Sequence, residues 1–231
     1  MPIVRRVVLL GSLCMNCFQY LLDRGSVNRM RASDNADGPV IVTGASSGIG
    51  HAVCRRLAAV GRPIISVDIE ENPREVVVEK HYACDLNSES DVTELFTDLV
   101  EDFDLSSVAS LINVAGVPGT QPASKVFEVN VLAVRRFSRF VASYLTAGSS
   151  IVNVGSISGN GWQQRIDTYR SLLQLNDEEA RNWWGDRKTS VETDPYSFSK
   201  EAVIVWSMLQ AGELQGTGIS CLLYTSPSPR D

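Results

Sequence analysis

A glycine-rich segment is the first part of the sequence whose residue types suit a chemical task. It reads Thr43-Gly-Ala-Ser-Ser-Gly-Ile-Gly50 and follows a β-branched apolar run. Gly44 permits a tight turn, Gly48 lets the backbone approach a ligand, and Gly50 allows a helix to pack closely. Because the free N–H groups at a helix start attract phosphate, this segment predicts a site for the pyrophosphate of a dinucleotide.

A carboxylate follows at a distance that suits recognition of a ribose. Asp68 directly follows the apolar run Ile64-Ile-Ser-Val67. Its distance from Gly50 is close to the spacing of about 20 residues expected for an acid that binds a ribose 2′-hydroxyl. The same carboxylate repels a 2′-phosphate, so Asp68 favours NAD over NADP. The simpler alternative is a solvated aspartate at the end of a strand.

Tyr196 and Lys200 form a second pair of side chains that are able to do chemistry. Four positions separate them, so on a helix both project from one face. A free tyrosine has a pKa near 10, about three units too high for a base at neutral pH, and lowering it that far costs roughly 4 kcal/mol. A lysine cation one turn away, together with the positive charge of an oxidised nicotinamide, favours the phenolate. The pair therefore predicts acid–base chemistry, whereas either residue alone would be an ordinary surface side chain.

Alternating strands and helices are predicted to hold these residues at one edge of a sheet. Apolar runs predict strands over residues 39–43, 64–67, 81–84, 108–113 and 150–154. Helices are expected over residues 49–60, 88–103, 124–145 and 195–212. The first helix is expected to bury Ile49, Val53, Leu57 and Val60. The expected fold class is therefore α/β, a single Rossmann-type doubly wound parallel sheet.

The composition is that of an ordinary globular protein and argues against several classes of function. The chain has 231 residues, of which 44% are hydrophobic, and a formal net charge of −6. An acidic chain is a poor partner for phosphate backbones and anionic lipid, so no nucleic acid or membrane partner is expected. The two histidines, His51 and His81, are interpreted as structural, and no metal site is expected. Five irregularly spaced cysteines favour a reducing, cytoplasmic compartment over a disulfide framework.

Five motifs occur in an order typical of one enzyme family. The chain resembles the short-chain dehydrogenase/reductase family through the glycine segment, Asn113-Val-Ala-Gly116, Asn130, Ser156 and Tyr196-Ser-Phe-Ser-Lys200. Val114 stands where that family often has a second asparagine, and we expect little effect from it. The match covers nearly all of the middle of the chain.

The resemblance implies a role for each matching residue. Tyr196 would be the catalytic acid/base, and Lys200 would also hold the nicotinamide ribose. Ser156 would hydrogen-bond the substrate oxygen, and Asn130 would hold a water that relays protons. The expected cofactor contacts are Gly44, Ser46, Ser47, Gly48, Ile49, Gly50, Asp68, Asp85, Leu86, Asn113, Ala115, Gly116, Tyr196 and Lys200.

The segment before the Tyr-Lys helix is much longer than in most members of that family. Its extra part, residues 161–194, contains two apolar helical patterns, the second opened by a cap at Asn176 and stopped at Gly185. Loops after strand ends line the ligand crevice in such folds. The insertion is therefore expected to be either a lid over the substrate or a packing or interface element. Candidates for the walls of an aromatic pocket are Trp162, Trp183 and Trp184.

The first 29 residues differ in character from the rest of the chain. A basic start precedes an apolar run over residues 7–22, which is shorter than the ~20 residues that a membrane span needs. This segment is a signal or anchor, an extension, or translated upstream sequence before a start at Met30, and we favour the last. Cys14 and Cys17 form a lone C-x-x-C without the further ligands that structural zinc requires.

The last residues, 221–231, also change character abruptly. They resemble the translation of an adapter used in sequencing libraries, and such segments are excluded from fold reasoning. We therefore expect a dinucleotide-binding domain over residues 30–220, in a fragment truncated within a strand that begins at residues 218–220.

Within the family, the long insertion and the motifs resemble most the coniferyl-alcohol dehydrogenases and, next, the 3α-hydroxysteroid dehydrogenase/carbonyl reductases. The resemblance implies oxidation of an aryl allylic alcohol to its aldehyde with NAD, or the hydroxysteroid reaction. A hypothesis from another class is a dinucleotide-binding regulator without catalysis, although such proteins typically lack the Tyr/Lys pair. The expected partner is a small-molecule alcohol or aldehyde, and a homo-oligomer is expected for the full-length protein.

Overall fold

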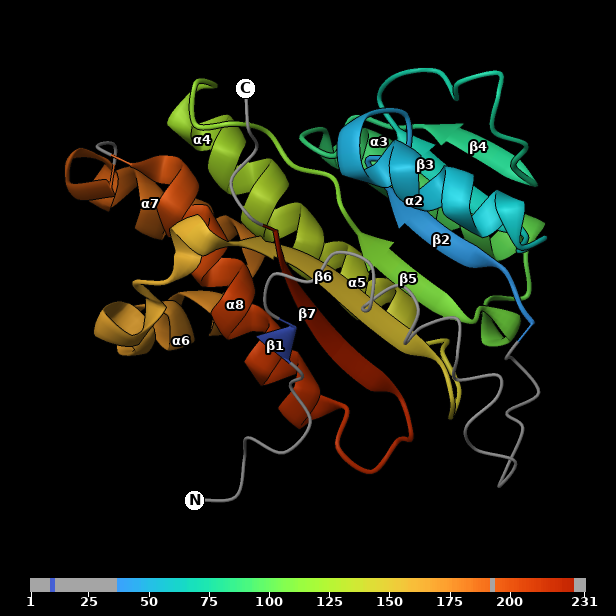
Figure 1. Ribbon diagram of the computed structural model, residues 1–231. Coiled ribbons are helices and arrows are strands. Elements are labelled where there is room, and N and C mark those ends of the chain that lie inside the picture. Colours follow the sequence, from blue (N-terminus) through green and yellow to red (C-terminus); the bar gives the residue numbers. More distant parts are fainter. Residues whose placement is uncertain (1–8, 11–36, 192–193, 227–231) are drawn as a thin grey trace.

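A computed structural model describes residues 9–10, 37–191 and 194–226 of the chain. Within these ranges, seven strands form one sheet in the order β1-β7-β6-β5-β2-β3-β4, and every neighbouring pair is parallel. The strands are β1 Leu9–Leu10, β2 Val40–Thr43, β3 Ile64–Asp68, β4 Lys80–Ala83, β5 Ser110–Asn113, β6 Ser150–Ser156 and β7 Ser220–Ser226. Helices cover both faces of the sheet (Figure 1), which confirms the expected doubly wound α/β class.

The two central strands bring the predicted site segments together. All four residues of β2 and all four of β5 are buried. Thr43 at the end of β2 pairs with Val67 on one side and with Asn113 on the other. The chain winds outward from β2 to β4, returns to β5, and then winds the opposite way. The loops after β2 and β5 therefore meet at the point of reversal, where ligands bind in folds of this kind.

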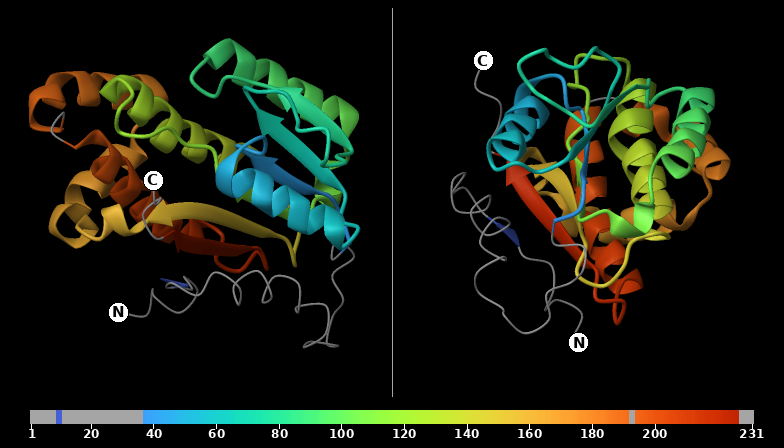
Figure 2. Two further views of the ribbon diagram at one scale, coloured as in Figure 1. Left: turned by 45° about the horizontal axis from the view of Figure 1, so that its top comes forward. Right: turned by 90° about the vertical axis from the view of Figure 1, so that its right-hand side faces the viewer.

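Helix α2 covers one face, and helices α3, α5 and α8 cover the other (Figure 2). Their bounds are α2 Gly48–Ala59, α3 Glu89–Asp102, α5 Val134–Ala142 and α8 Pro195–Glu213. On the second face, apolar side chains of α3 and α5 pack against Ile41, Leu111 and Ile151 of the sheet. Nowhere in the described ranges is a helix both long enough and apolar enough to cross a membrane.

The buried face of α2 differs from the predicted one. Gly50, Cys54 and Leu57 are its buried residues, whereas Ile49 is 43% exposed and Val60 is 47% exposed. Two apolar stripes are compatible with a helical period through Leu57, and the close approach of Gly50 to the loop after β2 selects the stripe that contains Cys54.

The long helix expected over residues 124–145 is interrupted by a change of winding. It consists of α4 Ala123–Phe127, a π-helical segment Glu128–Ala133, and α5, which ends three residues earlier than predicted. A π-helical turn inserts an extra residue into the helix and is frequent at functional sites. Asn130 lies within this segment.

Strand β7 extends beyond the expected domain boundary at residue 220. It pairs with β6 along its whole length, from Ser150↔Ser220 to Ser156↔Ser226. Cys221, Leu222 and Leu223 of this strand are buried. A short apolar run of this kind is typical of a parallel strand. In the structure these residues thus belong to the sheet, while the origin proposed for residues 221–231 stays a prediction.

The remaining expectations for the two ends fall mostly outside the described residues. Leu9 and Leu10 pair in parallel with β7. The Cys14–Cys17 pair, the start proposed at Met30 and residues 227–231 lie outside the described ranges.

The insertion forms two helices, α6 Ile166–Gln174 and α7 Asp177–Val191. The predicted cap at Asn176 is confirmed, because its side-chain Oδ1 accepts from the backbone amide of Glu179 at 2.8 Å. The backbone amide of Asn176 in turn donates to Glu179 Oε2 at 3.0 Å. The predicted stop at Gly185 is wrong, since α7 continues through it to Val191. A glycine weakens a helix interior by about 1 kcal/mol but does not end the helix by itself.

Replacing Gly185 by alanine is expected to stabilise the protein. The residue is exposed, and a Cβ there would meet no atom within 4 Å. Gly185→Ala should raise the free energy of unfolding by about 0.5–1 kcal/mol, because alanine loses less backbone entropy in a helix. Urea unfolding followed by circular dichroism measures this change, and a decrease in stability would contradict a helix that runs through residue 185.

Candidate active site

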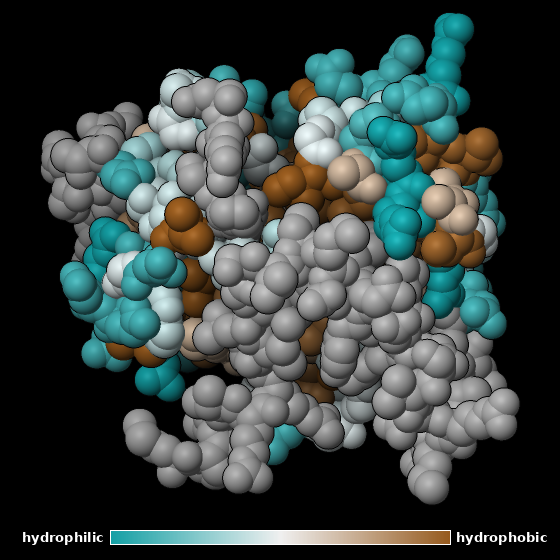
Figure 3. Space-filling view, in the orientation of Figure 1, coloured by the Kyte–Doolittle hydropathy of each residue, from teal (hydrophilic) through white to brown (hydrophobic). Residues whose placement is uncertain are grey.

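A cavity of about 820 Å³ lies at the carboxyl edge of the sheet. The loops after β2, β3, β4, β5 and β6 and the start of α8 form its wall. In the space-filling view, apolar side chains are visible between α4 and α2 on this side of the molecule (Figure 3). The predicted site residues that line the cavity are Gly44, Ser47, Gly48, Ile49, Asp68, Asp85, Leu86, Ala115, Gly116, Ser156, Tyr196 and Lys200.

The glycine segment forms a tight cradle that only glycine permits. Gly44 has a φ of +69° and Gly48 a φ of +51°, both in the left-handed region. A Cβ on Gly44 would lie 2.7 Å from the Ala115 amide nitrogen, and one on Gly50 would lie 1.8 Å from the Gly44 carbonyl oxygen. No atom lies within 4 Å of a Cβ built on Gly48, where α2 begins. The closed turn and the open helix start fit a bound pyrophosphate.

Asp68 fixes this cradle to the end of β3. Its Oδ2 accepts from the Ser46 amide at 2.8 Å, and its Oδ1 accepts from the Glu70 amide at 3.1 Å. Ser46 itself does not line the cavity, because its amide binds Asp68 and its hydroxyl donates to the Glu70 carbonyl. Ser46 thus holds the loop, and its expected cofactor contact stays a prediction, while Asp68 lines the cavity.

Helix α8 places Tyr196 and Lys200 on the opposite wall. The helix begins at Pro195, and the Asp194 carboxylate caps it by accepting from the Ser197 amide at 2.9 Å. Lys200 is only 7% exposed, and its Nζ donates to the Val154 carbonyl at 3.1 Å. The same Nζ lies 5.7 Å from the centre of the Tyr196 ring. The spacing of four residues thus brings the phenol and the ammonium together in one cavity.

Burial has a clear electrostatic effect on Lys200. It lowers the pKa of the ammonium from 10.5 to about 8, because the charged form loses its hydration. At neutral pH the side chain therefore remains mostly charged inside the cavity wall.

Replacing Lys200 by methionine is expected to stabilise the cofactor-free protein at pH 7 by about 2 kcal/mol. The folded-state pKa lies below the unfolded-state pKa, so the wild type gains stability as the pH rises from about 8 to 10.5. The variant lacks this gain, so the difference in free energy of unfolding between the variant and the wild type should shrink between pH 7 and pH 10. Urea unfolding of both proteins at each pH measures the difference, in which other titrating groups cancel. A difference that does not vary with pH would contradict the buried ammonium.

Ser156 and Asn130 differ in whether they line the cavity. Ser156 ends β6 and lines the cavity, and its Oγ accepts from the Ser158 amide at 3.2 Å. Asn130 is 1% exposed and does not line the cavity. Its Oδ1 accepts from the Val117 amide at 2.8 Å, while its Nδ2 donates to the Val117 carbonyl at 3.0 Å and to Ser199 Oγ at 3.1 Å. Both amide hydrogens are used, so the side chain has only acceptor capacity left for the expected relay water.

Asn113 does not line the cavity, so the expected cofactor contact stays a prediction. Its side chain is 3% exposed and lies in the core, where Nδ2 donates to Ser138 Oγ and to Asn153 Oδ1, both at 2.8 Å. These bonds join β5 to α5 and β6, because a buried amide must find partners inside the protein. Gly50 likewise contacts the Gly44 turn rather than lining the cavity.

The tryptophans of the insertion lie outside this cavity, and their expected part in an aromatic pocket stays a prediction. Trp162, Trp183 and Trp184 are absent from the cavity lining. Trp184 is 4% exposed and stacks on Phe127, with 4.4 Å between the ring centres. None of the described residues of the insertion lines the cavity, so whether it acts as a lid stays a prediction.

Several lining residues were not predicted from the sequence. They are Ile69, Glu70, Cys84, Val114, Val117, Pro118, Gly119, Lys125, Val129, Val154, Gly155 and Ser158. Most of them lie within two residues of a predicted site residue near a strand end, and that proximity is the signal that identifies them. Lys125 and Val129 lie one turn apart before Asn130, and their spacing alone carries no such signal.

Neither histidine lines the cavity. His51 Nε2 lies 3.4 Å from Glu75 Oε1, and His81 Nδ1 lies 2.9 Å from Ser66 Oγ. In the part of the chain that the structure describes, no group of three or more His, Cys, Asp or Glu side chains is arranged to hold a metal ion.

Comparison with known proteins gives consistent matches over this region. The family model for short chain dehydrogenases matches residues 39–171. Coniferyl-alcohol dehydrogenase from Pseudomonas sp. (strain HR199 / DSM 7063) is 33% identical over 174 residues, which cover 75% of this chain and 66% of that protein. A short chain dehydrogenase of Pseudocercospora fijiensis is 28% identical over 78% of this chain and 55% of its own length. The chain thus spans between about half and two thirds of these relatives.

Solved structures share the fold. The 3-alpha-hydroxysteroid dehydrogenase from Pseudomonas sp. B-0831, complexed with NADH, has a TM-score of 0.66 and 21% identity over 82% of this chain and 72% of that chain. A short chain dehydrogenase from Burkholderia cenocepacia J2315, in complex with NADP, has a TM-score of 0.56 and 21% identity over 83% and 74%. Together with the family model over more than half of its residues, these findings place the chain in the short-chain dehydrogenase family.

Proposed function

We propose that the protein is an NAD-dependent dehydrogenase that oxidises an aryl allylic alcohol, with coniferyl alcohol as the best candidate, to its aldehyde. The observation that carries this proposal is the position of Tyr196 and the buried Lys200 in one cavity with the glycine cradle. A non-catalytic dinucleotide-binding protein has no need of a buried ammonium beside a phenol. Burial of such a charge costs stability, which function must offset.

Each residue of the pair has a part in the oxidation of the alcohol. The alcohol gives up a proton from oxygen and a hydride from carbon. Tyr196 Oη accepts the proton, and the Lys200 ammonium stabilises the phenolate that does so. Ser156 Oγ hydrogen-bonds the reacting oxygen. A bound nicotinamide dinucleotide supplies the hydride acceptor.

The cavity wall also supports a preference for NAD. Asp68, the last residue of β3, and Glu70, two residues further on, both line the cavity. Carboxylates accept from ribose hydroxyls and repel a 2′-phosphate. Since similar structures contain NADH in one case and NADP in another, this preference rests on these two acids. Asp85 and Leu86 line the same end and would contact the adenine.

The choice of substrate rests on similarity. The relative with 33% identity acts on coniferyl alcohol by its name, and one structural neighbour is a 3-alpha-hydroxysteroid dehydrogenase, so a hydroxysteroid is the second candidate. Formation of the reduced cofactor at 340 nm tests both, with coniferyl alcohol, a 3α-hydroxysteroid and a simple secondary alcohol, each with NAD⁺ and NADP⁺. We expect the highest kcat/KM for coniferyl alcohol with NAD⁺. A higher value for the steroid would overturn the substrate, and NADH binding without any turnover would favour the regulator.

A further inference from the structure

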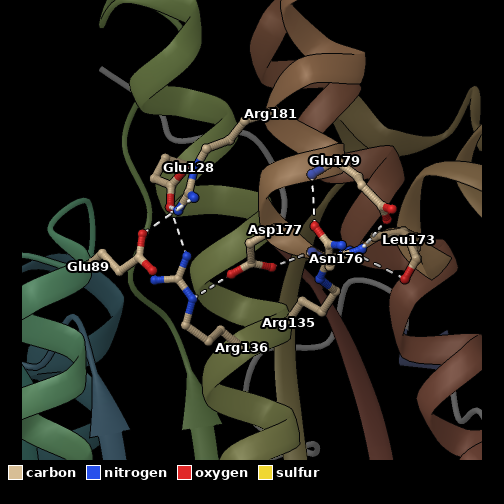
Figure 4. A network of polar contacts seen from close by, with 9 residues as sticks. All are labelled: Glu89, Glu128, Arg135, Arg136, Leu173, Asn176, Asp177, Glu179 and Arg181. Carbon is tan, nitrogen blue, oxygen red and sulfur yellow. Dashed lines mark hydrogen bonds and ion pairs between the residues drawn. The ribbon is translucent and has the colours of Figure 1, made fainter.

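An ion-pair network joins the inserted helix α7 to the π-helical segment (Figure 4). Glu128 Oε1 accepts from Arg136 Nη2 at 2.9 Å and from Arg181 Nη2 at 2.9 Å, and its Oε2 accepts from Arg181 Nε at 3.0 Å. Asp177, at the first position of α7, accepts from Arg136 Nε at 2.7 Å and from Arg135. Two carboxylates and three guanidinium groups thus connect α5, α7 and the segment between α4 and α5.

The centre of this network is buried, so its charges depend on one another. Glu128 is 9% exposed and Arg135 only 1%. Arg135 also donates to the Leu173 carbonyl near the end of α6, at 3.3 Å. Burial opposes ionisation of Asp177, but hydrogen bonds from Arg135 and Arg136 outweigh it and lower the pKa of Asp177 below its usual value. Loss of one partner would leave a buried charge without compensation, which proteins avoid. The turn between α6 and α7 is therefore tied firmly to α5.

A second connection ties the start of the insertion to α8. The Glu201 carboxylate, 3% exposed, accepts from Arg165 at 2.7 and 3.0 Å and from the Tyr169 hydroxyl at 2.6 Å. Glu201 follows Lys200 directly. Trp184 of α7 stacks on Phe127. The Trp184 ring also contacts the ring of Phe198, in α8, edge-on. The insertion is thus fixed at both of its helices.

The π-helical segment has a second side that faces the cavity loop. Glu128 and Asn130 lie two residues apart in this segment. Glu128 binds α7, whereas Asn130 binds Val117 of the cavity loop and Ser199 of α8. Ser199 in turn donates to the Tyr196 carbonyl at 2.7 Å. A continuous chain of contacts therefore runs from the insertion to the residue proposed as the acid/base.

We propose that the insertion is a fixed support for the π-helical segment rather than a moving lid, and that Glu128 is a positioning residue. Through Arg181 and Arg136, α7 and α5 hold the π-helical segment, which in turn holds the Asn130 amide against Val117 and Ser199. The inference rests on the proposed function in that these contacts matter for catalysis only if Tyr196 is the acid/base. Its test uses amide exchange, which remains interpretable if no substrate is turned over.

The Val117 amide reports directly on Asn130, because Asn130 Oδ1 is its acceptor. In Glu128→Gln, we expect this amide to exchange about tenfold faster, because the variant removes the charge that strengthens the hydrogen bonds from Arg136 and Arg181. The amides of Val67 and Ser66 in β3 should exchange as in the wild type. Glu89→Gln is the matched control, because Glu89 is a 75% exposed carboxylate 3.4 Å from Arg181 in the same network. That control should leave Val117 unchanged.

Arg181→Met provides a second variant if Glu128→Gln does not fold. It removes one partner of Glu128 and leaves Arg136 in place, so a smaller selective increase at Val117 is expected. An unchanged Val117 amide, or an equal increase at Val117 and in β3, would overturn the positioning role. Addition of NADH to the wild type tests whether the insertion is fixed. Exchange in α6 and α7 should stay constant, and increased protection there on NADH binding would show a lid.

Discussion

Replacing Tyr196 by phenylalanine is expected to lower kcat for alcohol oxidation by about 10³- to 10⁴-fold. The variant lacks the hydroxyl that accepts the proton of the substrate, and no other hydroxyl on α8 occupies its place. Phenylalanine keeps the ring that packs beside Gly119, so the affinity for NADH should stay within about twofold of the wild type. Steady-state kinetics and a fluorescence titration with NADH measure the two quantities.

Tyr144→Phe is the matched control for this experiment. Tyr144 is 38% exposed, lies after α5, and contacts the ring of Phe140. Its hydroxyl is remote from the cavity lining, so kcat should not change. A Tyr196→Phe protein that keeps wild-type turnover would remove the proposed mechanism. A variant that loses both turnover and NADH binding would point to a structural defect instead.

Gly50→Ala is expected to weaken NADH binding by about 10- to 100-fold, since overpacking of this kind costs about 1–3 kcal/mol. The new Cβ would lie 1.8 Å from the Gly44 carbonyl oxygen, so the turn after β2 must open. Opening displaces the N–H groups at the start of α2, which are proposed to bind the pyrophosphate. Isothermal titration with NADH measures the loss.

Gly212→Ala serves as the control, because a Cβ at that position in α8 meets no atom within 4 Å. Its affinity for NADH should equal that of the wild type. An unchanged affinity in Gly50→Ala would mean that the glycine cradle is not the dinucleotide site.

Local spacing was sufficient to predict that the glycine segment forms a tight turn and that Tyr196 and Lys200 share one helix face. The close packing of Gly50 in α2 against the Gly44 turn, and the position of Tyr196 and Lys200 on one helix face, follow from a few neighbouring residues. The buried face of α2 was not predictable in the same way, because apolar residues allow two stripes and only the packing of Gly50 decides between them.

Contacts between distant segments are not predictable from local spacing. Asn113 belongs to a matching motif, but its partners Ser138 and Asn153 lie 25 and 40 residues away and draw its amide into the core. Trp184 has the residue type of a substrate wall, yet its stacking on Phe127 depends on how α7 packs. The ion network could not be anticipated for the same reason, since tertiary packing decides which charges meet.

In the proposed reaction, a hydride passes from an alcohol carbon to a nicotinamide in this cavity while Tyr196 takes the proton. Coniferyl alcohol deuterated at its carbinol carbon, incubated with the protein and NAD⁺, tests it most directly through the mass of the NADH formed. Each NADH should carry one deuterium derived from the alcohol. Aldehyde formation that leaves the NADH unlabelled would contradict it.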